Sequence, residues 1–327
     1  MQLRNLIIKF IVFSVIIAGV YFFAIWQLAQ GQVDYFYSKF THQAGSMVIG
    51  ISRANDGIVP SVVEQNFGND KIDYPVLNFA FTNQISDFGP VYLNAIKKKI
   101  LPGTKNGLFI IEINPGSLSI LKSQPDTEST ILKDQSFLTK LRSFNKHPNF
   151  EYIREMYSHS LYKGFKKNRR IDVMRYCHAD GWQEVMQKNE YYEVSDEEIA
   201  EWTEGKLNEF SKTKDLFKPS SARFKYLEET IRYLQGFGQV YLVRLPICSE
   251  FHENEQSAWP EFNSQIEEIA GKNQVNYLDY SMMGAQYLTY DGSHLFGHSA
   301  KAFTQKLCDD IKLLQNQSNQ TEKQTDF

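Results

Sequence analysis

The sequence predicts an α/β domain built around a largely parallel sheet, because short runs of β-branched and aromatic residues alternate with helical patterns. Several of these runs are almost continuously apolar, which is typical of strands that are buried on both faces. The chain has 327 residues, of which 42% are hydrophobic, and this is enough for a large packed core. The net charge of −3 shows no excess of basic residues, so nucleic acid is not an expected partner.

The chain starts with an apolar segment that is long enough to cross a bilayer. Residues 10–26 carry no charge, and Arg4 and Lys9 precede them. The positive-inside rule then predicts a cytoplasmic amino terminus and an extracytoplasmic globular part, which would be periplasmic in a Gram-negative cell. Bulky aromatic residues end the segment where a cleaved signal peptide would have small ones. We therefore expect residues 1–30 to form a retained, single-pass anchor.

Five strands are expected after this anchor, and together they would form the sheet of one domain over residues 31–315. They are the segments 46–52, 74–81, 107–113, 239–245 and 275–280. Helices are expected between them, with Pro60 and Pro90 at first helical positions and Gly236 just past the end of another helix. The last helix has one apolar face, formed by Phe303, Leu307, Ile311 and Leu314. Residues 316–327 are polar and without periodicity, so a disordered tail is expected there.

A charged, tyrosine-rich and helical stretch at about residues 116–220 interrupts the alternation of strands and helices, and we interpret it as an insertion. Ser195 and Glu198 have the spacing of a capping box at the start of one of its helices. Such an insertion can form a lid over the carboxyl end of the sheet or a subdomain that only packs, and the sequence leaves both open. It also contains basic residues that favour a solvated helix face over an anionic partner: Lys163, Lys166, Lys167, Arg169 and Arg170.

Ser52 stands where the first predicted strand ends. The segment VIGISRANDGIVP places this hydroxyl at the carboxyl end of a parallel sheet, where α/β proteins present their sites. Gly50, two positions earlier, allows other groups to approach closely, and the N–H of Ser52 is positioned for an oxyanion. A strand that leads through Gly-x-Ser into a turn is a common pattern, and most serines at such positions only cap a helix.

Asp291 and His294 lie three residues apart in a turn before the last helix, in TYDGSHLFGHS. A carboxylate in such a turn can bind one imidazole nitrogen while the other nitrogen takes the proton of a serine. A polar turn with a surface histidine is the alternative for this pair in isolation. The pair indicates a catalytic site only in combination with Ser52, which lies near the opposite end of the domain in the sequence.

These two motifs together resemble those of membrane-anchored SGNH (GDSL-like) hydrolases and acyltransferases. GISRANDGIVP resembles the family's nucleophile block, and YDGSHL with its following helix resembles the Asp-x-x-His block. The resemblance implies a three-layer α/β/α domain with a mostly parallel, five-stranded, flavodoxin-like sheet. It also implies that Ser52 is the nucleophile, His294 the base and Asp291 the residue that orients His294.

The family also uses a glycine after the second strand and an asparagine after the third strand to bind the oxyanion. Asn114, in EINPGS, stands where the asparagine is expected, although Asn-Pro-Gly is also a common turn. No glycine follows the second strand in NFAFTN, where Asn78 and Asn83 flank a small alanine. Asn78 is therefore a second candidate for the oxyanion or substrate site, and the glycine block is missing.

Two arginines, Arg53 and Arg244, fall on the side of the sheet where a substrate would lie. A guanidinium there can bind a carboxylate or phosphate of the substrate, or it can form a structural ion pair, and the two interpretations are even.

The resemblance predicts an enzyme that acts on an ester-linked acyl group of an extracytoplasmic glycan or lipid, with water or a hydroxyl as acceptor. A non-catalytic anchored protein on a degenerate SGNH scaffold is the main alternative. A metal-assisted hydrolase using Asp279, Asp291 and His294 is a second one, although no spacing typical of zinc occurs. No phosphate loop or dinucleotide motif is present, so no cofactor or metal is expected. The three widely spaced cysteines suggest buried thiols, not disulfides.

Overall fold

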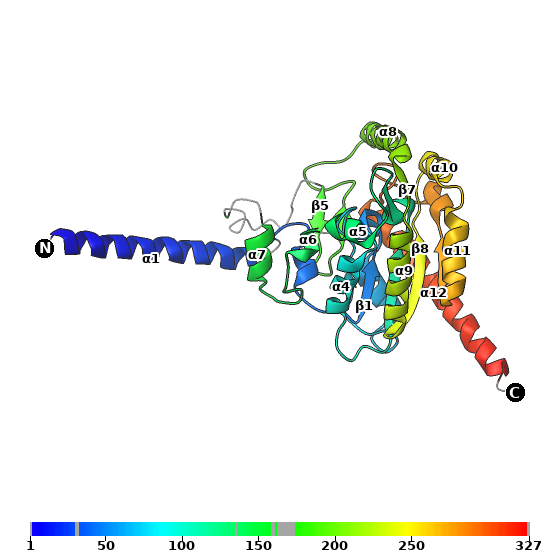
Figure 1. Ribbon diagram of the computed structural model, residues 1–327, viewed down its shortest axis with the longest axis horizontal. Helices are drawn as coiled ribbons and strands as arrows, with labels where there is room; N and C mark the ends of the chain where they lie inside the picture. Colours follow the sequence, from blue (N-terminus) through cyan, green and yellow to red (C-terminus); the bar gives the residue numbers. More distant parts are fainter. Residues whose placement is uncertain (1, 30–32, 135, 158–160, 162–173, 326–327) are drawn as a thin grey trace.

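The computed structural model describes residues 2–29, 33–134, 136–157, 161 and 174–325 (Figure 1). A five-stranded sheet lies at its centre in the order β2-β1-β3-β8-β9, and every neighbouring pair is parallel. Each strand overlaps one of the five predicted segments, so the prediction of an α/β fold with a parallel sheet is confirmed. The strands are β1 (Ser46–Ile49), β2 (Val76–Asn78), β3 (Gly107–Glu112), β8 (Gly238–Arg244) and β9 (Asn276–Asp279).

Helices cover both faces of the sheet. One face is packed by α2 (Ser52–Gly57), α3 (Pro60–Phe67) and α12 (Gly297–Thr325). The other face is packed by α4 (Pro90–Lys99), α9 (Ser221–Gln235) and α11 (Phe262–Asn273). Pro60 and Pro90 open their helices and Gly236 is the residue after α9, as the sequence predicts.

The strand β3 shows why the apolar runs are nearly continuous. Phe109 and Ile111 belong to the core on the α9 side, whereas Leu108 and Ile110 belong to the core on the α12 side. Because successive side chains of a strand point to opposite faces, a strand covered on both sides needs apolar residues at every position. All six residues of β3 are buried accordingly.

The amino-terminal helix α1 (Gln2–Ala29) projects from the domain (Figure 1). Its segment Leu3–Ala29 has 27 residues, and an 18-residue window within it has a mean hydropathy of 2.5, which makes it long and apolar enough to span a membrane or to act as a signal anchor. The helix extends past both ends of the apolar segment at 10–26. Its last turn meets α7 (Phe150–Met156), where the rings of Trp26 and Phe150 lie 6.5 Å apart.

The region between β3 and α9 is an insertion, but it is less helical than the sequence suggests. It contains the antiparallel pairs β4 (Ser119–Leu121) with β7 (Phe217–Pro219), and β5 (Arg175–Cys177) with β6 (Gln183–Val185). Strands of three residues are too short to show a period of two in the sequence. Its other elements within the described residues are η2 (Pro115–Leu118), α5 (Glu128–Asp134), α6 (Ser136–Thr139), α7, α8 (Asp196–Thr213) and η4 (Lys214–Leu216).

The capping box at the start of α8 is confirmed. Ser195 Oγ accepts a hydrogen bond from the Glu198 N–H, and the Glu198 carboxylate accepts one from the Ser195 N–H. The predicted basic cluster at residues 163–170 lies outside the described residues.

Three further short elements complete the domain, and α12 extends beyond the predicted helix end. The short elements are η1 (Tyr37–Phe40), α10 (Ser249–Ala258) and η5 (Ser281–Gln286). The helix α12 runs through the stretch predicted as a disordered tail up to Thr325, and residues 326 and 327 lie outside the described part. No proline or glycine follows Gly297 in this helix, so nothing in the sequence forces it to end at residue 315.

Candidate active site

The candidate site lies where the sheet changes direction. From β1 the chain crosses to the edge strand β2, and from β3 it crosses the other way to β8, so a crevice forms outside the carboxyl ends of β1 and β3. Ser52 follows β1 and Asn114 follows β3. Both predicted residues therefore border the position where open α/β sheets bind ligands.

Ser52, His294 and Asp291 form a chain of hydrogen bonds at this position. His294 Nε2 lies 2.8 Å from Ser52 Oγ. His294 Nδ1 lies 2.8 Å from one carboxylate oxygen of Asp291 and 3.0 Å from the other. A proton on Nδ1 that faces the carboxylate leaves Nε2 to accept the proton of the serine. Two motifs that are 242 residues apart thus converge in the arrangement that activates a serine.

The backbone before Ser52 makes a turn that only glycine fits. Gly50 has φ +148°, and a Cβ at this position would lie 2.8 Å from the side chain of Glu112. Ser86 donates a hydrogen bond of 2.7 Å to the Gly50 carbonyl and so holds the turn. Where the sequence suggests a polar turn after Ser52, the structure has the short helix α2, with Ser52 at its first position. The N–H groups of a first helical turn have no partner within the helix, which leaves the Ser52 N–H available to an oxyanion.

The loop that carries Asp291 and His294 is closed by the Asp291 carboxylate. One carboxylate oxygen accepts hydrogen bonds from the N–H groups of Ser293 and His294, at 3.0 and 2.9 Å. Gly292 has φ +77°, and a Cβ there would come within 3.0 Å of Thr203 and Cys248 side-chain atoms. Burial alone would raise the pKa of Asp291, but the charge of His294 and the hydrogen bonds to this carboxylate hold it below the ordinary value. Asp291 is therefore ionised and orients the imidazole.

Two contacts tie this loop to α2, which starts with Ser52. Arg53 Nε donates to Ser293 Oγ at 2.9 Å. The Tyr290 hydroxyl donates to Asp56 at 2.8 Å, and the Tyr290 ring stacks on His294 with centroids 5.4 Å apart. Burial raises the pKa of Asp56, against the opposing charges of His294 and Arg175 and its hydrogen bonds from Tyr290 and Asn55. These contacts fix the position of His294 relative to Ser52.

The two predicted substrate arginines share one buried carboxylate. Glu255, on α10, accepts from Arg53 Nη2 at 2.6 Å and from Arg244 Nη2 at 2.8 Å. Burial would raise the pKa of Glu255, but the two guanidinium charges hold it below the ordinary value. Arg244 is 1% exposed and also donates to Asn263, so its predicted substrate role is corrected to that of a structural ion pair. Arg53 also belongs to this ion-pair network, but it borders the cavity at Ser52, where its substrate role stays a prediction.

Asn114 is connected to the turn before Ser52 through Glu112, a fully buried carboxyl group at the end of β3. Asn114 Nδ2 donates to Glu112 Oε1 at 2.6 Å, and the Ile51 N–H donates to Glu112 Oε2 at 3.2 Å. The side-chain oxygen of Asn114, Oδ1, caps η2 by accepting from the Gly116 and Ser117 N–H groups. The amide of Asn114 keeps one hydrogen that Glu112 does not use. Burial raises the pKa of Glu112, against the charge of Arg53 and the hydrogen bonds from Asn114 and Ile51.

Asn78 does not take part in the site. Its side-chain amide donates to the carbonyl groups of Ala54 and Ile58, and its side-chain oxygen accepts from the Ala80 N–H. Asn78 is fully buried, so its predicted oxyanion or substrate role is corrected to that of a structural link between β2 and α2. Asn83, further along the same loop, borders the cavity instead.

A cavity of about 340 Å³ lies in front of the triad, and we call it the Ser52 cavity. Ser52, His294 and Asn114 line it together with Arg53. Its apolar walls come mainly from aromatic residues of α8, β7, α10 and the residue after α10, namely Phe210, Phe217, Phe251 and Trp259. The volume and this mixture of apolar walls with a few polar groups are typical of small-molecule sites. The insertion therefore forms part of the site wall and does not only pack against the domain.

No group of three or more histidine, cysteine, aspartate or glutamate residues within the described ranges could hold a metal ion. Asp279, a member of the alternative metal set, accepts from Asn263 and the Ser281 N–H. The cysteines are not paired, and burial raises the pKa of Cys177 and of Cys308 to about 12. Both thiols are therefore protonated near neutral pH.

Sequence reasoning missed the residues that hold the triad in place. Glu112 is a single acid in an apolar run and Glu255 is one of several acids in a polar stretch, so nothing in the sequence marks either of them as buried and paired. Tyr290 carries a weak signal, because it precedes Asp291 directly. The pairing of Arg53 with Ser293 joins two distant segments and leaves no local pattern.

No protein-family model matches the chain, and no curated protein sequence matches it either. Only the residues and the geometry of the site itself indicate a function.

Proposed function

We propose that the chain is an SGNH-type serine esterase or O-acyltransferase that acts on ester-linked acyl groups. The observation that carries the proposal is the pair of short contacts at His294, 2.8 Å to Ser52 Oγ and 2.8 Å to the Asp291 carboxylate. The strand order supports the same class. Counted along the sheet strands alone, β2-β1-β3-β8-β9 corresponds to the flavodoxin-like order 2-1-3-4-5.

In the proposed reaction Ser52 Oγ attacks the acyl carbonyl while His294 Nε2 takes its proton. The tetrahedral intermediate collapses, the alcohol leaves with that proton, and the acyl group remains as an ester on Ser52. A water molecule or a hydroxyl group then attacks this ester, with His294 acting as base and then as acid. Asp291 stabilises the imidazolium in both halves of the reaction.

The developing oxyanion would be bound by the Ser52 N–H and by the remaining amide hydrogen of Asn114. Both groups belong to residues that line the Ser52 cavity, and Glu112 holds Asn114 and the nucleophile turn together. Asn83 borders the same cavity in the loop after β2, where the family's glycine would stand. Fixed donors of this kind stabilise the transition state because they need no reorganisation during the reaction.

The membrane helix sets where the enzyme would act. With Arg4 and Lys9 on its amino-terminal side, α1 would leave the domain outside the cytoplasm, beside the membrane. Acylated envelope glycans or lipids are the substrates that this location favours.

A non-catalytic binding protein on the same scaffold is the second candidate. The observation that favours it is the missing glycine after β2, since one expected oxyanion donor is absent there. Such a protein would keep the fold and the cavity without an activated serine.

Labelling of the full chain in detergent with a fluorophosphonate probe distinguishes the serine enzyme from the non-catalytic binding protein. The enzyme is expected to be labelled, and Ser52→Ala and His294→Ala are expected to abolish labelling because they remove the nucleophile and its base. Ser61→Ala and His298→Ala are matched controls, since both residues are exposed and outside the Ser52 cavity, and both should be labelled like the wild type. A folded wild-type protein that does not react would favour the binding protein.

A further inference from the structure

The carboxyl-terminal end of α1 is part of the core of the domain. Residues 3–23 of this helix are all exposed, whereas its last turn is buried at Leu28 and Ala29. Both residues pack in the core on the α9 side of the sheet. The exposed part of the apolar helix therefore ends where the surface of the domain begins.

Hydrogen bonds join this end of α1 to α7. The Tyr37 hydroxyl donates to the Ala29 carbonyl at 3.2 Å and accepts from the Asn149 N–H at 3.0 Å. Asn149 also caps α7, because its side-chain oxygen accepts from the Tyr152 N–H. The rings of Tyr37 and Tyr152 meet edge to face, with centroids 5.5 Å apart. The two helices are thus held together by a joint that is both hydrogen-bonded and packed.

The length of α1 brings the bilayer up to this joint. Lys9 is the last charged residue of the apolar segment, and a hydrocarbon core of about 30 Å takes about 20 helical residues. Counted from Lys9, such a core ends near Ala29, and counted from Arg4 it ends near Ala24, which is buried as well. With α1 across a bilayer, the surface of the domain around its last turns therefore lies at the membrane interface.

The surface beside the joint carries residues that suit this depth. Trp26 and Phe150 are 49% and 47% exposed, and their rings lie 6.5 Å apart. Tryptophan is enriched where the hydrocarbon of a bilayer meets the headgroups. Transfer of both rings from water into this layer also removes apolar surface from water, which is favourable.

We propose, on the basis of the membrane location in the proposed function, that the end of α1 and α7 form a membrane-docking surface. Trp26 and Phe150 lie in the headgroup layer, and the partner is the lipid bilayer itself, which α1 enters directly beside this surface. The joint at Tyr37 couples the direction of α1 to that of the domain. The domain therefore sits on the membrane in one orientation.

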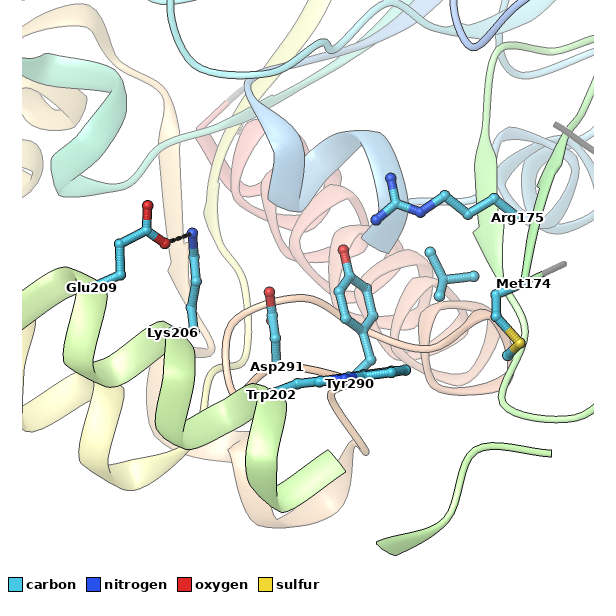
Figure 2. A pocket seen from close by; sticks show the side chains of 8 residues that line it. Met174, Arg175, Trp202, Lys206, Glu209, Tyr290 and Asp291 are labelled. Atoms are coloured by element: carbon cyan, nitrogen blue, oxygen red, sulfur yellow. Dashed lines mark hydrogen bonds and ion pairs between the residues drawn. The ribbon is translucent and has the colours of Figure 1, made fainter. Parts of the chain in front are cut away.

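This orientation determines which esters the site can reach. The helices α8 and α10, whose aromatic side chains wall the Ser52 cavity, lie away from the side of the domain from which α1 projects (Figure 1). The loop of Tyr290 and Asp291 lies with α8, since both residues line a cavity of about 590 Å³ together with Lys206 of that helix (Figure 2). Acylated glycans outside the bilayer fit this position of the triad, whereas lipids whose ester bonds lie within the bilayer do not.

The test is quenching of tryptophan fluorescence by lipids that carry bromine next to the headgroup, with the full chain reconstituted in phosphatidylcholine vesicles. Trp26→Phe removes the native indole from the docking surface, and Phe150→Trp in that background introduces one on α7. We expect the emission that Phe150→Trp adds to be lost in brominated vesicles, because the bromine atoms contact this indole.

Leu313→Trp in the same background is the matched control. Leu313 is 58% exposed on α12, and the carboxyl-terminal half of this helix lies on the side of the domain opposite to α1 (Figure 1). The emission that Leu313→Trp adds should be the same in brominated and unbrominated vesicles. Emission from Phe150→Trp that brominated lipid leaves unchanged would overturn the docking surface.

Neutron reflectometry of the wild-type chain in a supported bilayer needs no substitution. Protein density that begins at the headgroup layer is expected, and a layer of water between the headgroups and the domain would overturn the inference. Release of fatty acid from the phospholipids of the bilayer would overturn the predicted position of the Ser52 cavity outside it.

The proposed enzyme activity fails or holds separately, because fluorophosphonate labelling of the wild type in detergent needs no bilayer. Quenching of Phe150→Trp without labelling of the wild type would keep the docking surface and remove the esterase. Labelling without quenching would keep the serine enzyme and remove the docking surface.

Discussion

The two sides of the Ser52 cavity are built in different ways. The side that carries Ser52 and Asn114 grows out of buried strands, and its supporting acids Glu112 and Glu255 are 0% and 2% exposed. The opposite side is formed by α8, in which none of the eighteen residues is buried. The helix is held at its capped start and by the ring of Phe210, which lies 5.0 Å from that of Phe251.

The two sides would meet different requirements: one holds the reacting groups in place, and the other covers a substrate. Reacting groups must be held to within a fraction of an ångström, which requires rigid, packed support. A cover has to let substrate in and out, and elements that move are those with few buried contacts. Substitutions on the sheet side should therefore have large effects on stability or rate, and substitutions on α8 small ones.

The largest effect is expected for Glu255→Gln, which removes the carboxylate between Arg53 and Arg244. Two guanidinium groups would stay buried without this carboxylate, Arg244 keeping only its longer contact of 3.8 Å to Asp279, and the free energy of unfolding should fall by about 3–5 kcal/mol. Urea unfolding followed by circular dichroism measures this. Glu250→Gln, on the exposed face of the same helix α10, is the control and should change it by less than about 0.5 kcal/mol. Equal effects of the two variants would show that the buried network is not what supports this side.

Asn114→Ala should reduce the rate constant of fluorophosphonate labelling by a factor of roughly 10²–10³, as expected for the loss of one oxyanion donor. The same change removes the cap of η2, which should cost about 1 kcal/mol of stability. Labelling kinetics measure the loss of the oxyanion donor, and thermal unfolding measures the loss of the cap. A variant that loses stability but reacts at the wild-type rate would limit Asn114 to its capping role.

Glu112→Gln tests whether the buried carboxylate positions the nucleophile turn and Asn114. A glutamine can accept only one of the hydrogen bonds that the Ile51 N–H and Asn114 Nδ2 donate. We expect kcat for a small acetyl ester to fall roughly tenfold, which corresponds to about 1.4 kcal/mol, with little change in KM. A rise of KM with unchanged kcat would instead place Glu112 in substrate binding.

Phe210→Ala tests the exposed side. This ring is half-buried and contacts Phe251, so we expect the free energy of unfolding to fall by about 1 kcal/mol or less. Since the ring also lines the Ser52 cavity, KM for acyl esters should rise more than kcat falls. A loss of stability as large as that of Glu255→Gln would contradict the proposed contrast between the two sides.

The smallest effect concerns acid stability. Folding lowers the pKa of Asp291 below its ordinary value of 3.8, so its contribution to stability is complete above that value and is lost as the pH falls through the folded pKa. Between about pH 5 and about pH 3 the wild type should therefore lose more stability than Asp291→Asn, which has no carboxylate to protonate. Urea unfolding at several pH values measures the difference. Parallel pH curves would mean that the carboxylate is not stabilised by His294.

The contrast between the two sides also explains what the sequence could predict. Strands such as β3 need apolar residues at every position, and that constraint is visible without a structure. Ser52, Asp291 and His294 were found because two short motifs frame the domain. The partners of Arg53, Asn78 and Arg244 could not be derived, because they lie 202, 24 and 11 residues away and no helix or strand period connects the paired positions. The three-residue strands of the insertion are too short to leave a periodic signal.

The most direct test of the central claim is the mass of the protein after mixing with p-nitrophenyl acetate. If Ser52 is a nucleophile activated by His294, intact-mass spectrometry of rapidly quenched samples should show a gain of one acetyl group, mapped by peptide digestion to Ser52. The adduct should be absent in Ser52→Ala and should form far more slowly in His294→Ala, by a factor on the order of 10⁴. A folded wild-type protein that releases no p-nitrophenol and gains no acetyl group, or gains it at another residue, would contradict the claim.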